Sequence, residues 1–251
     1  MNDSMNWVAI SVIGAVVGFL AGVFGKGGSA VATPLLHAAG VPAIVAVAAP
    51  LPATIPSTLV AFSAYWHSHV VDRQVLWWSI AIGVPATIAG ALTTRWIDGA
   101  FLVRVTDAVI AGIGVWLLLR PDEEREMARD VRGYRARLVL VAAVVGVAAG
   151  LLANSGGFLL APLYLIVLRM PLKPAFACSL AVSAALAIPG TIVHAALGHV
   201  DWTVVALFGL TSVPLSFLGA RVAVRANSHR LEKTYGAVLV VLGVGFLAYG
   251  S

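Results

Sequence analysis

Two glycine-rich turns carry the residues of this sequence that are best suited to hold a ligand. One reads Gly25-Lys26-Gly27-Gly28-Ser29, and the other reads Asn154-Ser155-Gly156-Gly157. Glycine lets backbone N–H groups come close to a ligand, and the start of a following helix adds a partial positive charge. Lys26 adds a full positive charge. Together these features predict that the turns bind an anion.

Two structural interpretations of the same turns stay open. The glycines could serve only to bring helices close together, as small residues do in membranes. Lys26 could be a lysine of a cytoplasmic loop whose long side chain reaches into water. The first turn is not a phosphate-binding P-loop, because that motif requires glycine at position 20 and the sequence has Leu20. ATP is therefore not implied.

Hydroxyl side chains lie within two apolar segments that contain proline. The segment at 43–66 holds Thr54 and Ser57, and the segment at 174–197 holds Ser179 and Ser183. Broken helices expose backbone and hydroxyl groups at membrane depth, which is tolerated where these groups line a cavity. We therefore include these four residues in the predicted binding site. The alternative is that the hydroxyls bond back to the preceding turn of their own helix.

Ionisable residues within the apolar segments are scarce. His194, and His37 at the end of a short segment, are candidates for proton coupling, with hydrogen-bonded structural roles as the alternative. Asp72 and Asp201 precede long apolar segments and are predicted to be helix N-caps. Cys178, the single cysteine, is predicted to be buried.

No spacing of residues in the sequence indicates an enzyme. We find no serine–histidine–aspartate set, no carboxylate pair and no cluster with metal-ligand spacing. The expectation is a protein without catalytic residues, cofactor or metal.

The composition indicates an integral membrane protein. Hydrophobic residues make up 60% of the 251 residues and charged residues only 11%, whereas a soluble domain carries about 25% charged residues. A membrane-spanning helix needs roughly 20 apolar residues. Uncharged runs that meet this requirement include Trp7–Phe24, Gln74–Thr94, Leu138–Gly157 and Pro174–Val200. The net charge of +5 is attributed to cytoplasmic loops, so nucleic acid is not an expected partner.

The two halves of the chain repeat one pattern. With a single inserted residue, matching positions recur in the same order. The clearest pairs are Gly18/Gly146, Gly22/Gly150, Gly28/Gly156, Pro34/Pro162, Asp72/Asp201, Pro85/Pro214 and Gly90/Gly219. Two prolines and several glycines in matching order are strong evidence of a duplication.

Each half is predicted to contain about five helical elements, giving 8–10 transmembrane segments. In the first half (1–119) they are 7–24, 29–40, 43–66, 74–94 and 102–119. A charged linker covers 120–137. In the second half (138–251) they are 138–153, 156–168, 174–197, 202–221 and 232–249. The elements at 29–40 and 156–168 are short. The sequence therefore leaves open whether the elements at 29–40 and 43–66 cross the membrane fully or form a re-entrant hairpin.

The placement of basic residues predicts the orientation. If each half crosses the membrane an odd number of times, the linker and nearly all Lys and Arg face the cytoplasm, and only Arg95 and Arg104 lie outside. Both termini are then outside, and the halves form an inverted repeat. Short, glycine-flanked segments at matching places in inverted repeats indicate a transporter binding site.

The chain resembles the sulfite exporter TauE/SafE family of membrane transporters. The resemblance is carried by Gly18-x-x-x-Gly22-x-x-Gly25-x-Gly27-Gly28 with Pro34-Leu35, and by Gly146-x-x-x-Gly150 with Gly156-Gly157 and Pro162-Leu163. It covers both halves. The chain departs from the family pattern at Lys26, Ser29, Ala153, Asn154 and Ser155.

The resemblance implies movement of a small sulfur-containing anion, such as sulfite, thiosulfate or a sulfonate like sulfoacetate, across the bacterial cytoplasmic membrane. With the sequence features, it favours a secondary transporter working by alternating access. A passive anion channel and a non-transporting membrane assembly subunit are the alternatives. The expected partners are the anion and the lipid bilayer. The exact anion, the direction of transport, the coupling ion and the oligomeric state, including a homo-oligomer, stay open.

Overall fold

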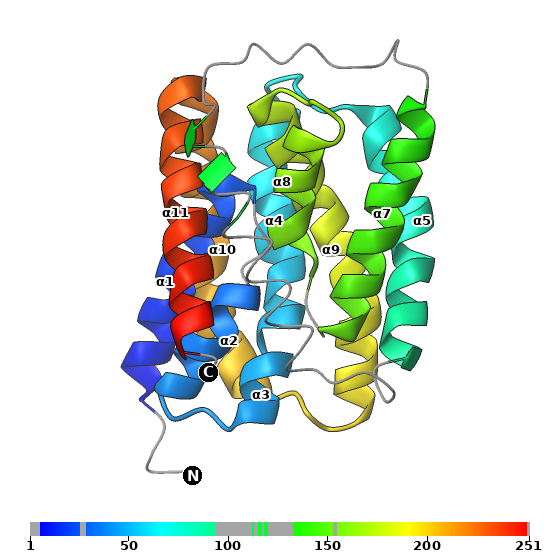
Figure 1. The fold of residues 1–251 in the computed structure, drawn as a ribbon. Helices are drawn as coiled ribbons and strands as arrows, with labels where there is room; N and C mark the ends of the chain where they lie inside the picture. The colour runs from blue at the N-terminus through cyan, green and yellow to red at the C-terminus, as the bar shows by residue number, and fades with distance from the viewer. Residues whose placement is uncertain are drawn as a thin grey trace.

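Every element in the described part of the chain is an α-helix, which confirms the all-helical prediction (Figure 1). The computed structural model describes residues 6–25, 29–93, 112, 115–116, 118–119, 133–152 and 155–249. Most of the predicted element at 102–119 and of the linker at 120–137 falls outside these ranges. The helices are α1 (Trp7–Phe24), α2 (Ser29–Ala38), α3 (Ala43–Ala48), α4 (Pro50–Trp66), α5 (Arg73–Thr93), α7 (Tyr134–Leu151), α8 (Gly157–Ile166), α9 (Leu172–Ala196), α10 (Trp202–Arg225) and α11 (Ser228–Tyr249).

Six spans among the described residues are long and apolar enough to cross a bilayer. They are Trp7–Phe24, Ala43–Trp66, Arg73–Thr93, Tyr134–Leu151, Leu172–Ala196 and Trp202–Arg225. Large apolar side chains on their outer faces are strongly exposed, with Val8 at 74%, Trp77 at 67% and Leu210 at 73%. Such a surface suits lipid and would be unfavourable in water. The chain is therefore a multi-pass membrane protein.

Helices α7, α10 and α11 extend further into charged sequence than the composition suggested, with α11 beginning at Ser228 rather than at 232. Helix α10 continues to Arg225 rather than ending at 221, and α7 begins at Tyr134 within the predicted linker. Arginine side chains at a membrane boundary can place their charge in water while the backbone stays helical. A charged residue therefore marks the edge of the apolar core and not the end of the helix.

The predicted N-caps are confirmed at two helices. The Asp72 carboxylate accepts hydrogen bonds from the N–H groups of Gln74 (3.0 Å) and Val75 (3.2 Å) at the start of α5. Asp201 does the same for Thr203 (2.8 Å) and Val204 (3.3 Å) at the start of α10. Each carboxylate satisfies N–H groups that have no partner within the helix.

The predicted segment at 43–66 divides into α3 and α4 at Ala49. Pro50 and Pro52 have no N–H group to donate to the preceding turn, so the hydrogen-bond ladder of a continuous helix is interrupted there.

Corresponding helices of the two halves run in opposite directions. In Figure 1, α1, α4 and α10 ascend from the end that carries both termini, while α5, α7 and α9 descend toward it. Helix α1 packs along α10, α5 packs along α7, and α4 contacts α9. A helix at the start of each half is therefore paired with a helix of the other half.

Glycines bring these paired helices into backbone contact. A Cβ atom at Gly22 of α1 would overlap the Ser216 carbonyl oxygen and lie 2.8 Å from the Ala220 nitrogen of α10. A Cβ atom at Gly150 of α7 would likewise overlap the Thr87 carbonyl oxygen and lie 2.6 Å from the Ala91 nitrogen of α5. The residues of the first contact match those of the second in the duplicated pattern. The two contacts therefore occur at matching positions of the predicted duplication.

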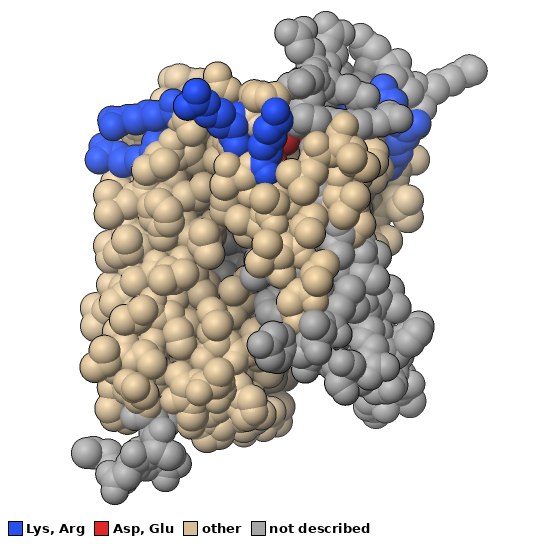
Figure 2. All heavy atoms as spheres, turned by 60° about the vertical axis from the view of Figure 1, so that its left-hand side comes forward, with Lys and Arg blue, Asp and Glu red and all other residues tan. Residues whose placement is uncertain are grey.

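Basic side chains collect at one end of the molecule. Figure 2 shows them at the upper end of the view, and Figure 1 shows that α1 begins at the opposite end. Every Lys and Arg of the described ranges lies at a helix end or connection on that side: Arg73, Arg135, Arg137, Arg169, Lys173, Arg221, Arg225, Arg230 and Lys233. Such one-sided charge is what the positive-inside rule describes.

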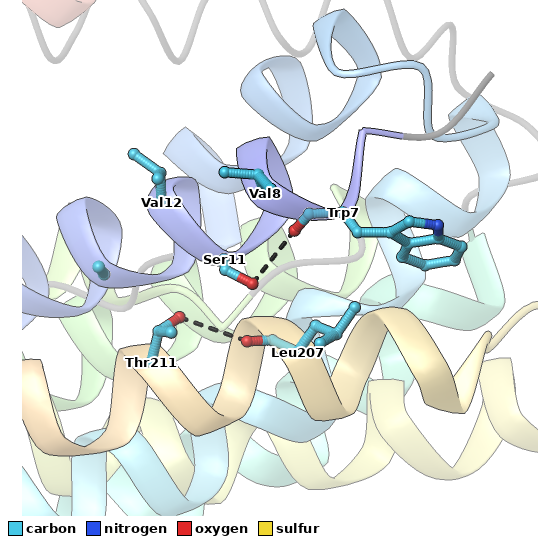
Figure 3. A pocket seen from close by; sticks show the side chains of 7 residues that line it. Trp7, Val8, Ser11, Val12, Leu207 and Thr211 are labelled. Carbon is cyan, nitrogen blue, oxygen red and sulfur yellow. Dashed lines mark hydrogen bonds between the residues drawn. The ribbon is translucent and has the colours of Figure 1, made fainter. Parts of the chain in front are cut away.

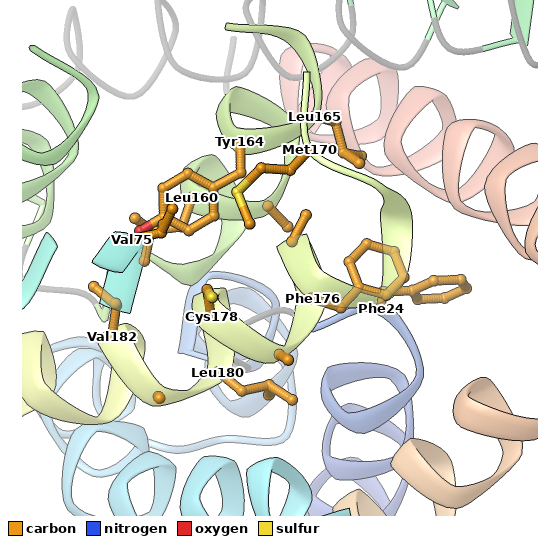
Figure 4. Packing of buried hydrophobic residues seen from close by; sticks show 14 of the residues in the cluster. Phe24, Val75, Leu160, Tyr164, Leu165, Met170, Phe176, Cys178, Leu180 and Val182 are labelled. Carbon is orange, nitrogen blue, oxygen red and sulfur yellow. The ribbon is translucent and has the colours of Figure 1, made fainter. Parts of the chain in front are cut away.

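The larger buried apolar cluster surrounds α8 and α9 (Figure 4). Phe176 of α9 meets the Tyr235 ring edge-on at a centroid distance of 5.0 Å, and Phe24 of α1 stacks on Tyr235 at 5.4 Å. Cys178 is buried in this cluster, as predicted, and its Sγ lies 3.5 Å from the Asp72 carbonyl oxygen. The cluster joins α8, α9 and α11 to the end of α1.

The α1–α10 contact can be tested by adding one methyl group. We expect Gly22→Ala to lower the unfolding midpoint of the purified protein by about 2–10 °C, because overpacking a backbone contact costs about 1–3 kcal/mol. Gly245→Ala in α11 is the matched control, because an added Cβ there has no atom within 4 Å. Differential scanning fluorimetry in detergent provides the measurement. Equal midpoints for the two variants would contradict the contact.

Candidate functional site

Only some of the residues of the predicted binding site lie in the described part of the chain. Lys26, Gly27, Gly28 and Asn154 lie outside the described residues, and Ser29 is described only as the first residue of α2. The second turn is described from Ser155 onward, so it defines the candidate site.

The second glycine turn lies inside the protein, between α7 and α9. Gly156 has a left-handed backbone with φ of +66°. A Cβ atom there would lie 3.0 Å from Val145 Cγ1, 3.1 Å from Ala149 Cβ and 3.1 Å from Leu186 Cδ1. Both the backbone angle and the limited space therefore require glycine at this position.

Helix α8 begins at this turn and is buried from its first residue. Gly157 through Pro162 are all buried, and Ser155 is 1% exposed. The first N–H groups of a helix have no partner within it and carry the positive end of its dipole. With ten residues, α8 is about 15 Å long, half of a typical hydrocarbon core. Its N-terminus therefore lies within the protein.

One face of α9 is turned toward this helix start. Ser179 Oγ donates a hydrogen bond to the Gly157 carbonyl oxygen at 3.2 Å, and Leu186 contacts the Gly156 position. Ser183 lies one helical turn beyond Ser179 and one turn before Leu186, so all three share a face. The Ser183 hydroxyl is therefore directed toward the side of α9 that covers the glycine turn.

The Ser183 hydroxyl is buried without a hydrogen-bond partner. Its side chain is 0% exposed, and its Oγ bonds no group among the described residues. Most buried polar atoms are paired, so an unpaired one calls for a specific explanation. Because it lies on the face of α9 that contacts the start of α8, an anion at that helix start could accept a hydrogen bond from it.

The two predicted hydroxyls of α4 behave differently. Thr54 Oγ1 donates to the Pro50 carbonyl oxygen at 2.8 Å, and Ser57 Oγ donates to the Thr54 carbonyl oxygen at 3.1 Å. Both are buried and bond within their own helix, as the structural alternative expected. Thr54 matches Ser183 in the duplicated pattern, yet only Ser183 has a free hydroxyl.

The two predicted proton-coupling histidines lie away from the glycine turn. His37 is exposed in the last turn of α2, and its Nδ1 lies 3.2 Å from the Val41 carbonyl oxygen. His194 is half-buried in the last turn of α9, with its Nδ1 3.3 Å from the Nδ1 of His199. His194 is two helical turns beyond Leu186. Neither histidine shares the interior with Ser183.

Sequence reasoning missed the buried tyrosines, among them Tyr164, Tyr65 and Tyr235. Tyr164 of α8 donates to Ser79 Oγ of α5 at 2.6 Å, and Tyr65 of α4 donates to the Gly22 carbonyl oxygen at 3.4 Å. Among the described residues, no group is hydrogen-bonded to the buried Tyr235 hydroxyl. Tyrosine within an apolar segment needs a partner for its hydroxyl. That rule could have indicated these positions, although not their partners.

An open groove on the outer face of α1 and α10 does not fit a solute site (Figure 3). Its volume is about 450 Å³. The two hydroxyls that line it bond within their own helices, Ser11 to the Trp7 carbonyl oxygen at 3.1 Å and Thr211 to that of Leu207 at 3.3 Å. The remaining lining is Trp7, Val8, Val12, Ala15 and Leu207. Such a surface suits a lipid chain.

Comparison with known proteins finds one matching family and several similar sequences. The family described as sulfite exporter TauE/SafE matches residues 10–246. A probable membrane transporter protein of Xylella fastidiosa (strain 9a5c) is 29% identical, covering 92% of this chain and 91% of its own length. The probable membrane transporter protein YjnA of Bacillus subtilis (strain 168) is 24% identical, covering 94% of this chain and 98% of its own length. No solved structure gives a significant match.

The contrast between Ser179 and Ser183 can be tested through stability. Ser179→Ala removes a buried hydrogen bond, so we expect the free energy of unfolding to fall by about 1 kcal/mol. Ser183→Ala removes a hydroxyl that has no partner, so the ligand-free protein should be equally or slightly more stable. Denaturant or thermal unfolding of both variants without added anion measures this. Equal destabilisation by both would show that Ser183 is hydrogen-bonded.

Proposed function

The chain belongs to the sulfite exporter TauE/SafE family, and from this we propose that it is a secondary transporter of a small sulfur-containing oxyanion or organosulfonate. Sulfite, thiosulfate and sulfoacetate represent the substrate class. The family and the names of the relatives support membrane transport. The substrate class is inferred from the family description and from the chemistry of the site.

The observation that carries this assignment is the buried start of α8 opposite the free Ser183 hydroxyl. The N–H groups at a helix start and a hydroxyl donor can contact several oxygens of one anion without a full protein charge. The described Lys and Arg residues lie at one end of the molecule, so none supplies charge at this position. Lys26, in the matching turn of the first half, is proposed to supply it.

The proposed ligand set joins the two glycine turns. Gly27, Gly28, Gly156 and Gly157 would donate backbone N–H bonds. The side chains of Ser29, Asn154 and Ser155 would orient the anion. Ser179 holds the carbonyl of Gly157 and so positions the second turn, while Ser183 donates to the anion directly.

Alternating access between two inverted repeats is the proposed mechanism. It is supported by the opposite directions of corresponding helices and by their matched glycine contacts. One polar contact differs between the halves. Ser216 Oγ of α10 lies within hydrogen-bond distance of the Ser57 carbonyl oxygen of α4 (2.7 Å) and of the Val213 carbonyl oxygen of its own helix (2.8 Å), whereas the matching Thr87 of α5 donates to the Gly83 carbonyl oxygen of its own helix at 2.8 Å. In the alternate state we expect Thr87 to donate to the Leu186 carbonyl oxygen of α9.

The proposed orientation places the basic end in the cytoplasm and both termini outside, in the inner membrane of a bacterium. The one-sided distribution of Lys and Arg supports it. The substrate site would then lie between the two surfaces, where the paired halves meet.

Transport in proteoliposomes tests the proposed activity. We expect saturable uptake of at least one of sulfite, thiosulfate and sulfoacetate, and none of a simple carboxylate. Ser183→Ala should raise the half-saturating concentration about tenfold, since a hydrogen bond to a charged ligand contributes about 1.5–3 kcal/mol. Lys26→Ala should weaken uptake further. Thr93→Ala, whose hydroxyl bonds within its own helix, is the control and should transport normally.

Three other outcomes would contradict this activity. Flux that never saturates and shows no counter-transport would indicate a passive channel. Absence of uptake by correctly inserted protein that purifies with a second protein would indicate an assembly subunit. Unchanged affinity in both Ser183→Ala and Lys26→Ala would move the site elsewhere.

The mechanism predicts opposite effects at two matching residues. Ser216→Ala should destabilise the present state by about 1 kcal/mol, and Thr87→Ala should destabilise the alternate state by a similar amount. Each change corresponds to roughly a fivefold shift in the population ratio of the two states. Cysteines introduced singly at Trp202 and at Arg225, in a Cys178→Ala background, would report access from the two ends. If Ser216→Ala and Thr87→Ala shift the labelling rate of the same reporter cysteine in the same direction, the proposed exchange between two states is contradicted.

A further inference from the structure

The C-terminal end of α9 brings two imidazole rings together through its backbone. The Gly198 N–H donates to the Ala195 carbonyl oxygen at 3.1 Å, and the His199 N–H donates to the His194 carbonyl oxygen at 3.0 Å. Gly198 has a left-handed backbone with φ of +72°. These features define a Schellman motif, in which the side chains at the positions of His194 and His199 touch. Apolar residues usually make that contact, and here two histidines make it.

The distance between the rings matches that of two ligands on one metal ion. The Nδ1 atoms are 3.3 Å apart, and the ring centroids are 5.5 Å apart with an interplanar angle of 54°. A nitrogen ligand lies about 2.0–2.1 Å from Zn²⁺, so two such ligands at a tetrahedral angle are about 3.3 Å apart. An ion can therefore be bound by both Nδ1 atoms with the backbone fixed as it is.

We propose that His194 and His199 form a two-ligand site for a divalent transition-metal ion, with Zn²⁺ as the representative and Ni²⁺ and Cu²⁺ as related choices. Imidazole nitrogen suits these ions and not Mg²⁺ or Ca²⁺. Both rings are half-buried, so water can complete the coordination. No group of three or more His, Cys, Asp or Glu that could hold a metal occurs in the described residues, and binding is accordingly weaker than at a four-ligand structural site.

The metal competes with a hydrogen bond between the same two atoms. In the absence of metal, one Nδ1–H can donate to the other Nδ1, whereas coordination requires both rings to carry their proton on Nε2. The site uses no residue of the proposed anion site and does not depend on the transport function. It lies at the end of the molecule that carries the termini, opposite the basic end.

Calorimetry on the full-length protein tests this site. The protein is purified in detergent without a polyhistidine tag and titrated with Zn²⁺, with Mg²⁺ as the negative control. We expect one saturable Zn²⁺ site per chain. His194→Ala and His199→Ala should each weaken binding at least about tenfold, because one remaining ligand loses the chelate advantage. His229→Ala, at the start of α11 near the opposite end, is the matched control and should bind Zn²⁺ normally.

A second readout separates loss of a ligand from loss of folding. Zn²⁺ should raise the unfolding midpoint of the wild-type protein and of His229→Ala, but not that of His194→Gln or His199→Gln, which keep a polar side chain of similar reach. Absence of saturable Zn²⁺ binding by the wild-type protein would overturn the site. So would unchanged affinity in well-folded variants of both histidines.

Discussion

The contact on which this structure depends is the approach of helix backbones at Gly22 and Gly150. At both positions a methyl group would overlap a carbonyl oxygen of the partner helix. In lipid there is little hydrophobic force between helices, so close van der Waals contact has to supply much of the association. Each contact joins the first helix of one half to a late helix of the other half. The same arrangement therefore occurs twice between the two predicted halves.

This pairing determines where short helices can lie. With α1 on α10 and α5 on α7, the crossing of α4 and α9 joins the two pairs. Helix α8 is then buried against α9, and its first residue lies inside the protein. Burial of a helix start removes its first N–H groups from water, which is unfavourable unless another group accepts their hydrogen bonds. The free Ser183 hydroxyl adds to that cost. Both features become favourable when a ligand that accepts hydrogen bonds is present, which is why they indicate a binding site.

Much of the fold follows from local sequence. Uncharged runs locate the spanning helices, and Asp72 and Asp201 mark helix starts because a carboxylate there satisfies free N–H groups. Helices α7 and α10 extend beyond their predicted ends, because arginine side chains there can reach water while the backbone stays helical. The element at 102–119 and the division into two halves and a linker remain predictions.

The site was less accessible to sequence reasoning. Thr54 and Ser183 match in the duplication, but whether each hydroxyl bonds its own helix depends on rotamers and on what packs opposite. That information is not local. The histidine pair is different, because His194-Ala-Ala-Leu-Gly-His199 contains the glycine that ends a helix and two residues that the resulting motif brings together. A closer reading of that segment could have predicted their contact.

The most direct test of the central claim is whether a transported anion protects the position of Ser183. A Ser183→Cys variant in a Cys178→Ala background would be alkylated by a small thiol reagent with and without sulfite, thiosulfate or sulfoacetate, and Thr191→Cys, two turns further along α9, would serve as the reference. We predict that the transported anion slows alkylation at position 183 in a saturable manner and leaves position 191 unchanged. Equal alkylation of position 183 with and without each anion would contradict a substrate site at the start of α8.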